Sequence, residues 1–406
     1  MRWLYCLLLA ALVSAKVRYD GHQVLRLVPR NRDQLQVLRD LEDSPNGLDF
    51  WTSARAVNVT VDVRVPPQMR AGFLSAVNTH GLETQVFIDD VQKMVDSQER
   101  RAGTPRAEFD WTSYHDLDEL NAWLLGLNQS FPVVQPVVGG RTYEGRDIQG
   151  VKVSYKAGNP RIFVESGIHA REWIAPATAT WILNQLLTSQ DEDVRFVAEN
   201  FDWYIFPSVN PDGYQYSHTT DRMWRKTRTP GTRCFGVDGN RNWDNYWNQG
   251  GASSNECSET YAGTGPFSTV EASSLAATIQ GLSPSVYLCF HSYSQLLMIP
   301  YGHQFQTVSN YDQLMSIGNA AAESLAQRYG TQYEMGPIYE VIYVATGGSM
   351  DWAASSAGVQ FPFEWELRDT GHYGFLLPAD QIVPTAQETL DSVVTILKLA
   401  AAALRS

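Results

Sequence analysis

The chain has 406 residues, of which 44% are hydrophobic and 18% charged, so it can build a sizeable core and is not a disordered chain. With 31 basic and 44 acidic residues, its formal net charge is −13. Because an acidic chain repels a phosphate backbone, we expect no nucleic-acid partner.

The first 15 residues have the pattern of a secretory signal peptide. Arg2 gives a positive start, residues 3–13 are apolar, and residues 13–15 form a small-residue cleavage site. This apolar segment is too short to span a bilayer, and no other uninterrupted apolar run reaches about 18 residues. We therefore expect residues 1–15 to be removed and the protein to be secreted without a membrane anchor.

Residues 16–101 predict a small domain of their own. They hold 12 basic and 12 acidic residues, so the acidic excess lies beyond Arg101. The apolar spacing predicts strands at 22–29, 56–67 and 83–90, and helices at 32–43 and 67–81. One face of the middle strand would carry Val57, Val59, Val61, Val63 and Val65. We expect the order β-α-β-β-α-β, an α+β ferredoxin-like sheet with two helices on one face.

Residues 91–109 predict a polar helix that runs into an exposed hinge. Arg100 and Arg101 stand just before Gly103 and Pro105, and Arg106 follows. Basic residues beside glycine and proline are typical of linkers that proteases can cut, and also of ordinary linkers between domains. The hinge separates the small domain from residues 102–406.

The pattern after the hinge predicts a larger α/β domain. Apolar strands are expected at 161–167, 201–210 and 285–292. Helices are expected at 112–127 (with a Ser/Thr start), 175–189, 271–282, 313–330 and 393–404. Strands that alternate with helices indicate a mixed, largely parallel central sheet flanked by helices.

The segment GIHAREW, residues 167–173, places two candidate metal ligands where a strand ends. His169 and Glu172 are three residues apart, so their side chains would lie on one side of a helical turn. His291 ends another apolar strand, where a parallel sheet opens its ligand crevice. Two histidines and a glutamate with an open fourth position suit a catalytic Zn²⁺ ion.

A general base could come from FPFEWELRDTG, residues 361–371. Glu364 and Glu366 are two apart on an aromatic strand and therefore face the same way. Two carboxylates on one apolar face are costly to bury without a purpose. The spacing alone does not choose between them.

Several cations recur near these motifs. Arg222 and Arg225 lie in one segment, Asn240 and Arg241 in another, and Arg171 lies inside the metal motif itself. Arginines beside a metal suggest a carboxylate or phosphate ligand, and surface ion pairing is the alternative.

Three cysteines remain after the signal segment, which favours one disulfide and one free thiol. Cys234 and Cys257 lie in a loop-like region, and closing that loop would contribute about 3 kcal/mol. Cys289 lies in an apolar strand and is expected to be a buried free thiol. Two N-x-S/T sequons could carry glycans, at Asn58 and Asn128.

Taken together, five motifs resemble those of the secreted metallocarboxypeptidases of the pancreatic A/B type. They are HARE, NRNWD, HSYSQLL, GGSMDW and WELRDTG, in that order, and the resemblance extends to the opening GHQVLRL of the small domain. It implies a zinc peptidase made as a zymogen. Residues 16–101 would be its inhibitory activation prodomain with a connecting helix, and 102–406 its catalytic domain.

The resemblance assigns roles at the metal by position. The zinc ligands would be His169, Glu172 and His291, and Asp238 would orient a ligand histidine. The catalytic glutamate would be Glu366 rather than Glu364, because Glu366 directly precedes Leu-Arg-Asp. Arg225 would polarise the scissile carbonyl.

It also assigns the residues that hold the substrate. The terminal carboxylate would be bound by Asn240, Arg241 and the mobile Tyr343. The outer subsites would be lined by Arg171, Ser292 and Tyr293, and the family disulfide would be Cys234–Cys257. The substrates would be peptide and protein C-termini.

The preferred C-terminal residue depends on two positions in the pocket. Met350 replaces the aspartate that would select C-terminal Lys or Arg, so we expect the A type, with aliphatic or aromatic preference. Glu364 aligns with a small residue of the same pocket and gives the alternative, a B-type preference for Lys or Arg. A carboxyl in a dry pocket can instead keep its proton.

Activation by a trypsin-like protease would follow from a cut after Arg101, or after Arg106. We expect a monomer. An inactive secreted binding protein of the same fold is the rival hypothesis, and the complete set of ligand, base and arginine residues argues against it.

Overall fold

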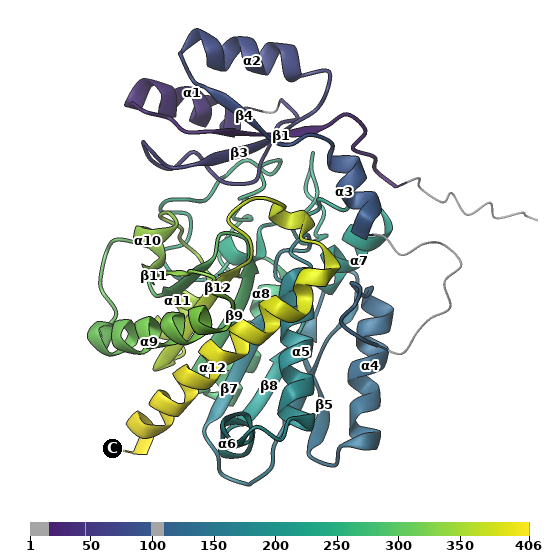
Figure 1. The fold of residues 1–406 in the computed structure, drawn as a ribbon, viewed down its shortest axis with the longest axis vertical. Coiled ribbons are helices and arrows are strands. Elements are labelled where there is room, and N and C mark those ends of the chain that lie inside the picture. Colours follow the sequence, from purple (N-terminus) through teal and green to yellow (C-terminus); the bar gives the residue numbers. More distant parts are fainter. Residues whose placement is uncertain (1–15, 45, 99–108, 406) are drawn as a thin grey trace, which may run out of the picture.

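The computed structural model describes residues 16–44, 46–98 and 109–405, which form two stacked units (Figure 1). The predicted signal segment 1–15 and the candidate cleavage residues Arg101 and Arg106 lie outside the described residues.

The smaller unit is a four-stranded antiparallel sheet with strand order β2-β3-β1-β4. Its elements are β1 (Gln23–Leu27), α1 (Arg32–Asp43), β2 (Asp49–Phe50), β3 (Val61–Val65), α2 (Arg70–Thr79) and β4 (Thr84–Ile88). Helices α1 and α2 bury Leu38 and Val77 against Leu25 and Val63, which face each other on β1 and β3. This is the β-α-β-β-α-β order expected from the sequence.

The middle strand of this unit is shorter than predicted. Asn58 has a φ of 65°, and β3 begins only at Val61. Val57 and Val59 are half-buried outside the strand, because a left-handed residue between them interrupts the extended backbone. The remaining strand of the expected order is the two-residue β2. It lies outside the segments in which apolar and polar residues alternate.

The larger unit contains an eight-stranded mixed sheet of order β11-β10-β12-β9-β7-β8-β6-β5. Its strands are β5 (Val134–Arg141), β6 (Asp147–Val153), β7 (Arg161–Ser166), β8 (Asp202–Phe206), β9 (Val286–Ser292), β10 (Leu296–Ile299), β11 (Glu334–Pro337) and β12 (Phe361–Leu367). The four adjacent strands β12, β9, β7 and β8 are parallel, and antiparallel neighbours flank them. The expected mixed, largely parallel sheet is present at its centre.

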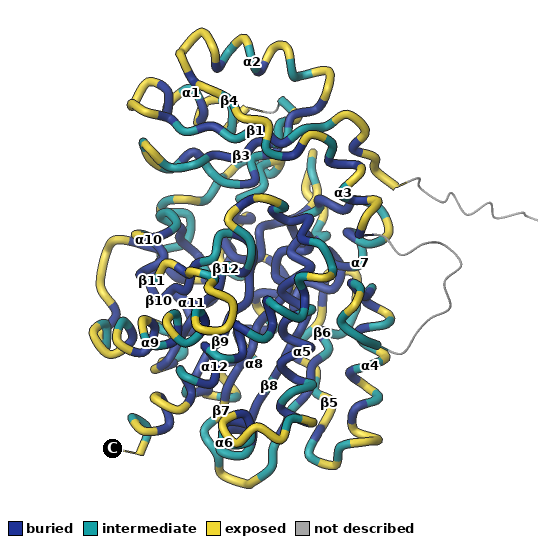
Figure 2. The backbone as a smooth tube through the Cα atoms, in the orientation of Figure 1, coloured by how far each residue is buried: buried dark blue, intermediate teal, exposed yellow. Residues whose placement is uncertain are grey.

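Helices cover both faces of this sheet (Figures 1 and 2). One face packs on α4 (Leu117–Ser130), α5 (Ile174–Thr188), α6 (Glu192–Asn200), α9 (Tyr311–Tyr329) and α12 (Ile382–Arg405). The other face packs on α8 (Val270–Leu282), α10 (Ile338–Val341) and α11 (Ser349–Ser355). The remaining helices are α3 (Val91–Gln98) and α7 (Pro211–Thr219). With helices on both faces, the central strands are buried and read as continuous apolar runs.

The start of α4 differs from the prediction. The helix begins at Leu117, and its N-cap is Asp116, whose side chain accepts a hydrogen bond from the Glu119 N–H at 2.9 Å. The predicted Ser/Thr start at residues 112–113 is wrong. His115 bonds to the Asp110 carbonyl at 2.8 Å and to Glu119 at 2.9 Å, which holds the preceding residues in a non-helical turn.

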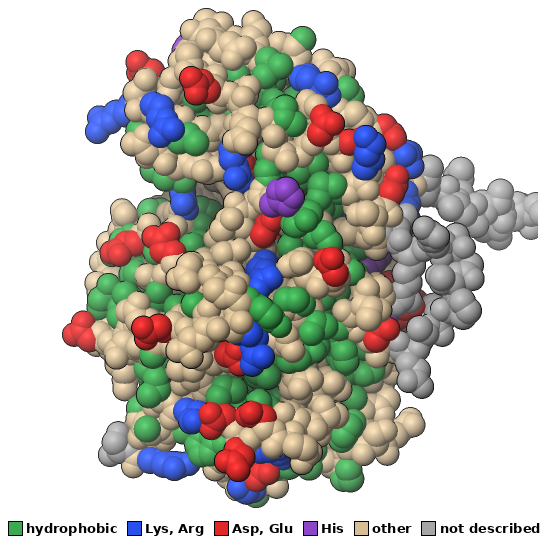
Figure 3. Space-filling model, viewed as in Figure 1, with side chains coloured by type: hydrophobic (Ala, Val, Ile, Leu, Met, Phe, Trp, Pro, Cys, Tyr) green, Lys and Arg blue, Asp and Glu red, His purple; other side chains and the backbone are tan. Residues whose placement is uncertain are grey.

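Charged side chains of both signs are interspersed on the face seen in Figure 3. None of the helices in the described residues has the length and apolar character needed to cross a membrane.

Candidate active site

The candidate metal ligands lie at the carboxyl ends of adjacent parallel strands. His169 and Glu172 lie in the turn between β7 and α5, and His291 is the penultimate residue of β9. Glu366 on β12 is in register with His291. β7, β9 and β12 lie side by side in the sheet (Figure 1). Three sequence-distant segments therefore bring these residues to the carboxyl ends of neighbouring strands.

The three ligand groups converge as a metal site requires. Ligand atoms of His169, Glu172 and His291 lie within 4.8 Å of one another. The two Nδ1 atoms are 3.1 Å apart, and Glu172 reaches them at 2.8 Å and 3.3 Å. Two imidazole nitrogens and one carboxylate are the donor set of a catalytic zinc site.

The charges around this site favour a cation. Burial acts to raise the pKa of Glu172, but His169 and His291 lower it well below its usual range. Burial acts to lower the pKa of His291, but Glu364 and Glu172 raise it to about 10. A fully buried cluster of this kind binds a positive charge, which a divalent metal supplies.

Asp238 contacts His169 on the side of the imidazole ring away from the metal position. Its Oδ1 lies 3.1 Å from His169 Nε2, and its Oδ2 accepts from Arg225 Nη2 at 2.9 Å. Burial acts to raise the pKa of Asp238, but Arg225 and His169 hold it well below its usual range. The bond at Nε2 leaves Nδ1 of His169 directed at the metal position.

Glu366 is placed as an unpaired carboxyl beside the ligands. Its Oε2 is buried and has no hydrogen-bond partner among the described residues. Burial, together with the Glu172 carboxylate, raises the pKa of Glu366 well above its usual range. A carboxyl held in this way attracts a proton, as a general base must.

A cationic pocket lies beside the metal position. Arg241 Nη2 donates to the Tyr343 hydroxyl at 3.0 Å, and its other nitrogens donate to the carbonyls of Gly251 and Asn240, each at 2.8 Å. Asn240 is fixed in turn, because its N–H donates to Asp238 and its Oδ1 accepts from the Ser349 N–H, each at 2.9 Å. Asn240, Arg241 and Tyr343 line one cavity of about 840 Å³ together with His169, Glu172 and Glu366.

Met350 and Glu364 line the same cavity, and the exposed fractions of these residues are 1% and 5%. Burial raises the pKa of Glu364, and the nearby Glu165 adds to this, although His291 opposes it. The neighbouring Asp351 is also buried, and its pKa is raised to about 8. The pocket is thus apolar at Met350, and burial disfavours the charged forms of the Glu364 and Asp351 carboxyls at the other walls.

The outer residues of the cavity contact the smaller unit. Arg171 Nη1 lies 3.1 Å from Asp49 Oδ1, and its guanidinium stacks on Phe375 at 4.2 Å. The Tyr293 hydroxyl donates to Asp62 at 2.9 Å. Ser292 is held by its N–H, which donates to Glu172 at 3.2 Å. The smaller unit thus places two carboxylates over the mouth of the cavity.

Sequence reasoning missed Asp49, Asp62, Asp351 and Glu165. Asp49 lies in the short β2, which was not predicted, and Asp62 lies in a strand that read only as part of a small sheet, so no local pattern marks them. Asp351 follows Met350 directly and could have been found as an acid beside the pocket. Arg222 donates to the carbonyls of Arg171 and Phe375 and is not among the described residues that line the cavity.

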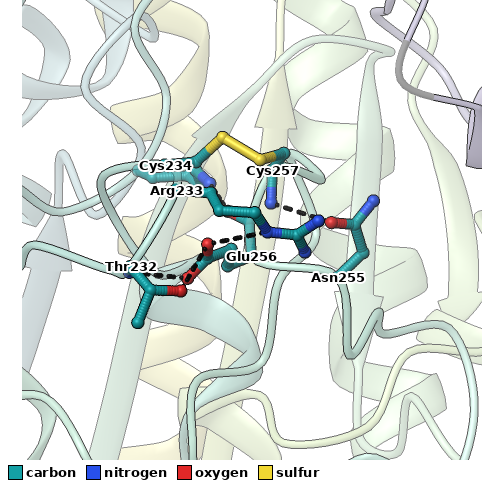
Figure 4. The surroundings of a disulfide bond; sticks show 7 residues. Thr232, Arg233, Cys234, Asn255, Glu256 and Cys257 are labelled. Atoms are coloured by element: carbon teal, nitrogen blue, oxygen red, sulfur yellow. Dashed lines mark hydrogen bonds and ion pairs between the residues drawn. A yellow bond between two sulfur atoms is a disulfide. The ribbon is translucent and has the colours of Figure 1, made fainter.

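The described cysteines form one disulfide and one free thiol. The structure joins Cys234 and Cys257, across a sequence separation of 23, and Glu256 beside the bridge accepts from Thr232 and Arg233 (Figure 4). Cys289 is a buried free thiol, as expected. Asn58 and Asn128 are both exposed.

Two family models match this chain. One, described as zinc carboxypeptidase, matches residues 120–392, and the other, described as carboxypeptidase activation peptide, matches residues 25–98. The two matches fall on the larger and the smaller unit.

Individual relatives match over most of their length. The chain is 58% identical to a zinc carboxypeptidase of Simulium vittatum, over 70% of this chain and 96% of that protein. It is 44% identical to zinc carboxypeptidase A 1 of Anopheles gambiae, over 94% of this chain and 90% of that protein. The solved structure of carboxypeptidase A from Helicoverpa armigera matches with a TM-score of 0.86 at 29% identity, covering 97% of this chain and 100% of that one.

Proposed function

The chain belongs to the zinc carboxypeptidase family, and we propose that its catalytic unit removes single residues from the C-termini of peptides and proteins after the activation peptide is cut away. The observation that carries the proposal is the convergence of three groups at one site. They are the ligand set His169, Glu172 and His291, the unpaired Glu366, and the carboxylate-binding Arg241.

Bound zinc supplies Lewis acidity, which activates a water molecule at neutral pH. Glu366 takes a proton from the attacking water and returns it to the leaving amine. Arg225, whose Nη1 is 3.6 Å from Glu172 Oε1, stabilises the negative charge that develops on the carbonyl oxygen. Asp238 holds both His169 and Arg225 in place for this step.

Arg241 restricts the enzyme to chain ends. Asn240, Arg241 and Tyr343 bind the terminal carboxylate, which pairs with the buried guanidinium. An internal peptide bond would leave that buried guanidinium without an anionic partner, and this costs several kcal/mol. The same residues argue against an aminopeptidase, because Asn240 and Arg241 are the opposite of the acidic anchor that a substrate amine needs.

For the side chain, we propose an aliphatic or aromatic preference. The buried Met350 supports it, and so does the raised pKa of Glu364, because a protonated carboxyl does not demand a cation. A Lys or Arg preference through an ionised Glu364 is the alternative. In both hypotheses, Met350 and Glu364 form walls of the pocket for the C-terminal side chain.

We also propose that the protein is secreted as a zymogen. The signal-like segment 1–15 supports export, and the contacts of Asp49 with Arg171 and of Asp62 with Tyr293 support blockage of the cavity by the smaller unit. A trypsin-like cut after Arg101, or after Arg106, would lie between the two family segments.

Trypsin-treated protein tests the proposal. Matched peptides ending in Phe, Leu, Met, Lys, Arg or Glu, with free or amidated C-termini, would be followed by mass spectrometry at pH 6 and pH 8.5. We expect release of Phe, Leu and Met from free peptides only. Release of Lys and Arg that increases with pH would instead assign the pocket to ionised Glu364, and cleavage of amidated peptides would contradict the role of Arg241.

A further inference from the structure

The zinc ligand His291 is supported from behind by groups that the reaction itself does not use. With Nδ1 directed at the metal position, its Nε2 lies 3.1 Å from Cys289 Sγ. The Cys289 thiol donates to Glu165 Oε1 at 3.5 Å. These three residues come from the adjacent strands β7 and β9, where Glu165 and Cys289 are in register.

Glu165 is fully buried and accepts more than one bond. The Tyr287 hydroxyl donates to its Oε2 at 2.6 Å, and the Ser349 hydroxyl donates to its Oε1 at 3.0 Å. With the Cys289 thiol, three donors converge on its two oxygens, which act here only as acceptors. The exposed fractions of Glu165, Tyr287, Cys289 and Ser349 are all 1% or less.

We propose that Cys289 and Glu165 are positioning residues that fix the orientation of His291 for zinc. The bond from Nε2–H to the thiol selects the neutral tautomer whose Nδ1 lone pair faces the metal, and Glu165 orients the thiol. Bonds in series polarise one another, so a sulfur that donates to a carboxylate is a better acceptor. We call Cys289, Glu165, Tyr287 and Ser349 the His291 relay.

The relay gives His291 a partner of a different kind from that of His169. His169 Nε2 contacts the carboxylate of Asp238 directly, whereas His291 reaches a carboxylate only through a thiol. The relay also extends to the substrate pocket, because the Ser349 N–H donates to Asn240 Oδ1. One buried network therefore links a metal ligand to a residue proposed to bind the terminal carboxylate.

The same atoms could be thought of as a second metal site, because ligand atoms of Glu165, Cys289 and His291 lie within 4.8 Å of one another. Two observations favour the relay. Both oxygens of Glu165 already accept hydroxyl or thiol bonds, and neither Cys289 nor Glu165 lines the cavity in the described part of the chain. A metal there would have to displace bonds in a closed core.

The inference rests on the proposed zinc site, and metal binding to the full-length zymogen tests it without peptide cleavage. Zinc affinity would be measured by chelator competition, and the ligand geometry by the visible absorption of the Co²⁺ form. We expect Cys289→Ala and Glu165→Gln to weaken zinc binding about 10- to 100-fold and to change the Co²⁺ spectrum. Cys289→Ser, which keeps a donor and an acceptor, should stay within about threefold of wild type.

The matched control is Leu288→Val, on the same strand but in the core on the opposite face. It should lower the unfolding temperature and leave zinc affinity unchanged. The relay is overturned if Cys289→Ala binds zinc and Co²⁺ as wild type does, if Leu288→Val weakens zinc equally, or if wild type binds two zinc ions. Failure of the zinc site itself would appear differently, as a wild-type affinity that His169→Ala does not change.

Discussion

Glu366 and Glu364 show how position decides the role of a side chain. They face the same way on β12, where Glu364 is buried and Glu366 is half-buried. Glu366 is in register with His291. Glu364 is in register with Cys289, two residues further along the strands from the metal position. A difference of two residues along one strand therefore separates a candidate base from a pocket wall.

Replacing Glu366 by Gln keeps the shape of the side chain and removes its capacity to take a proton. We expect kcat of the activated enzyme to fall about 10²- to 10⁴-fold, the usual contribution of a general base. Zinc content, measured by metal analysis, should stay at one per chain. Glu364→Gln is the matched control and should leave kcat for a C-terminal Phe peptide within about tenfold, and equal losses in both variants would contradict this assignment.

Asp351 makes stability depend on pH. Burial raises its pKa to about 8 in the folded state, although the Gly302 N–H bond opposes this, and in the unfolded chain the pKa returns to about 3.8. Between these values the folded state binds more protons, so this residue lowers stability as pH rises from about 4 to 8. Above pH 8 its effect is constant.

Asp351→Asn removes that dependence. Its free energy of unfolding, measured in urea, should exceed that of wild type by more than about 1 kcal/mol at pH 8, the value of one pKa unit. At pH 4 the two proteins should agree. Asp244→Asn, at an exposed position, should show no such trend, and a difference that is independent of pH would argue against a protonated Asp351.

At the scale of elements, the residues proposed to bind the terminal carboxylate lie on a segment with little regular structure. Asp238, Asn240 and Arg241 surround a single 3₁₀ turn at Gly239–Arg241, within the loop closed by Cys234 and Cys257. The hydrogen bonds of Glu256 pack the two arms of that loop together (Figure 4). A long loop of this kind needs covalent closure to keep its side chains in place.

Removing the disulfide tests that statement. The double variant Cys234→Ser, Cys257→Ser should lose about 3 kcal/mol of unfolding free energy, as expected for a loop of this length. KM for short peptides should also rise, because Asn240 and Arg241 lose their support. Asp116→Ala removes the cap of α4 and should cost about 1 kcal/mol with KM unchanged. A raised KM in Asp116→Ala would show that KM follows global stability instead.

At the scale of the whole molecule, the two units meet through charged groups at the cavity. Burial acts to raise the pKa of Asp49, but Arg171 and Arg64 lower it, so its carboxylate stays charged between two guanidinium groups. Arg26 ties Asp62 to the same interface, and its Nη2 also donates to the carbonyl of Gly371. Buried ion pairs of this kind are costly to break from one side.

Asp49→Ala should loosen the zymogen. We expect the uncut variant to hydrolyse a short peptide at least about tenfold faster than the uncut wild type, because one buried pair that holds the cavity closed is lost. After trypsin treatment the two proteins should be equal. Asp89→Asn is the matched control, because the Asp89 carboxylate accepts a hydrogen bond from Gln23 within the small unit. No activity gain in Asp49→Ala would assign the blockage to other contacts.

The sequence by itself determined the local features. Apolar runs predicted β7, β9 and β12, and His169, His291 and Glu366 stood out as polar residues at the carboxyl ends of those runs. The end of a buried strand can be predicted from composition alone. The cap of α4 at Asp116 and the break at Asn58 were missed. Several neighbouring residues are equally suited to cap a helix or to take a left-handed conformation, so the local sequence does not choose between them.

Only the tertiary structure decided what lies side by side. The order of the eight strands puts Glu165 next to Cys289 and Glu366 next to His291, and the docking of the small unit puts Asp49 against Arg171. These partners are 122 or more residues apart, except for the pair on β9 and β12, which are 75 apart (366 − 291). The periodicity of the sequence predicts on which face of its helix or strand a side chain lies. Sheet order and burial determine which charged groups share a low-dielectric site.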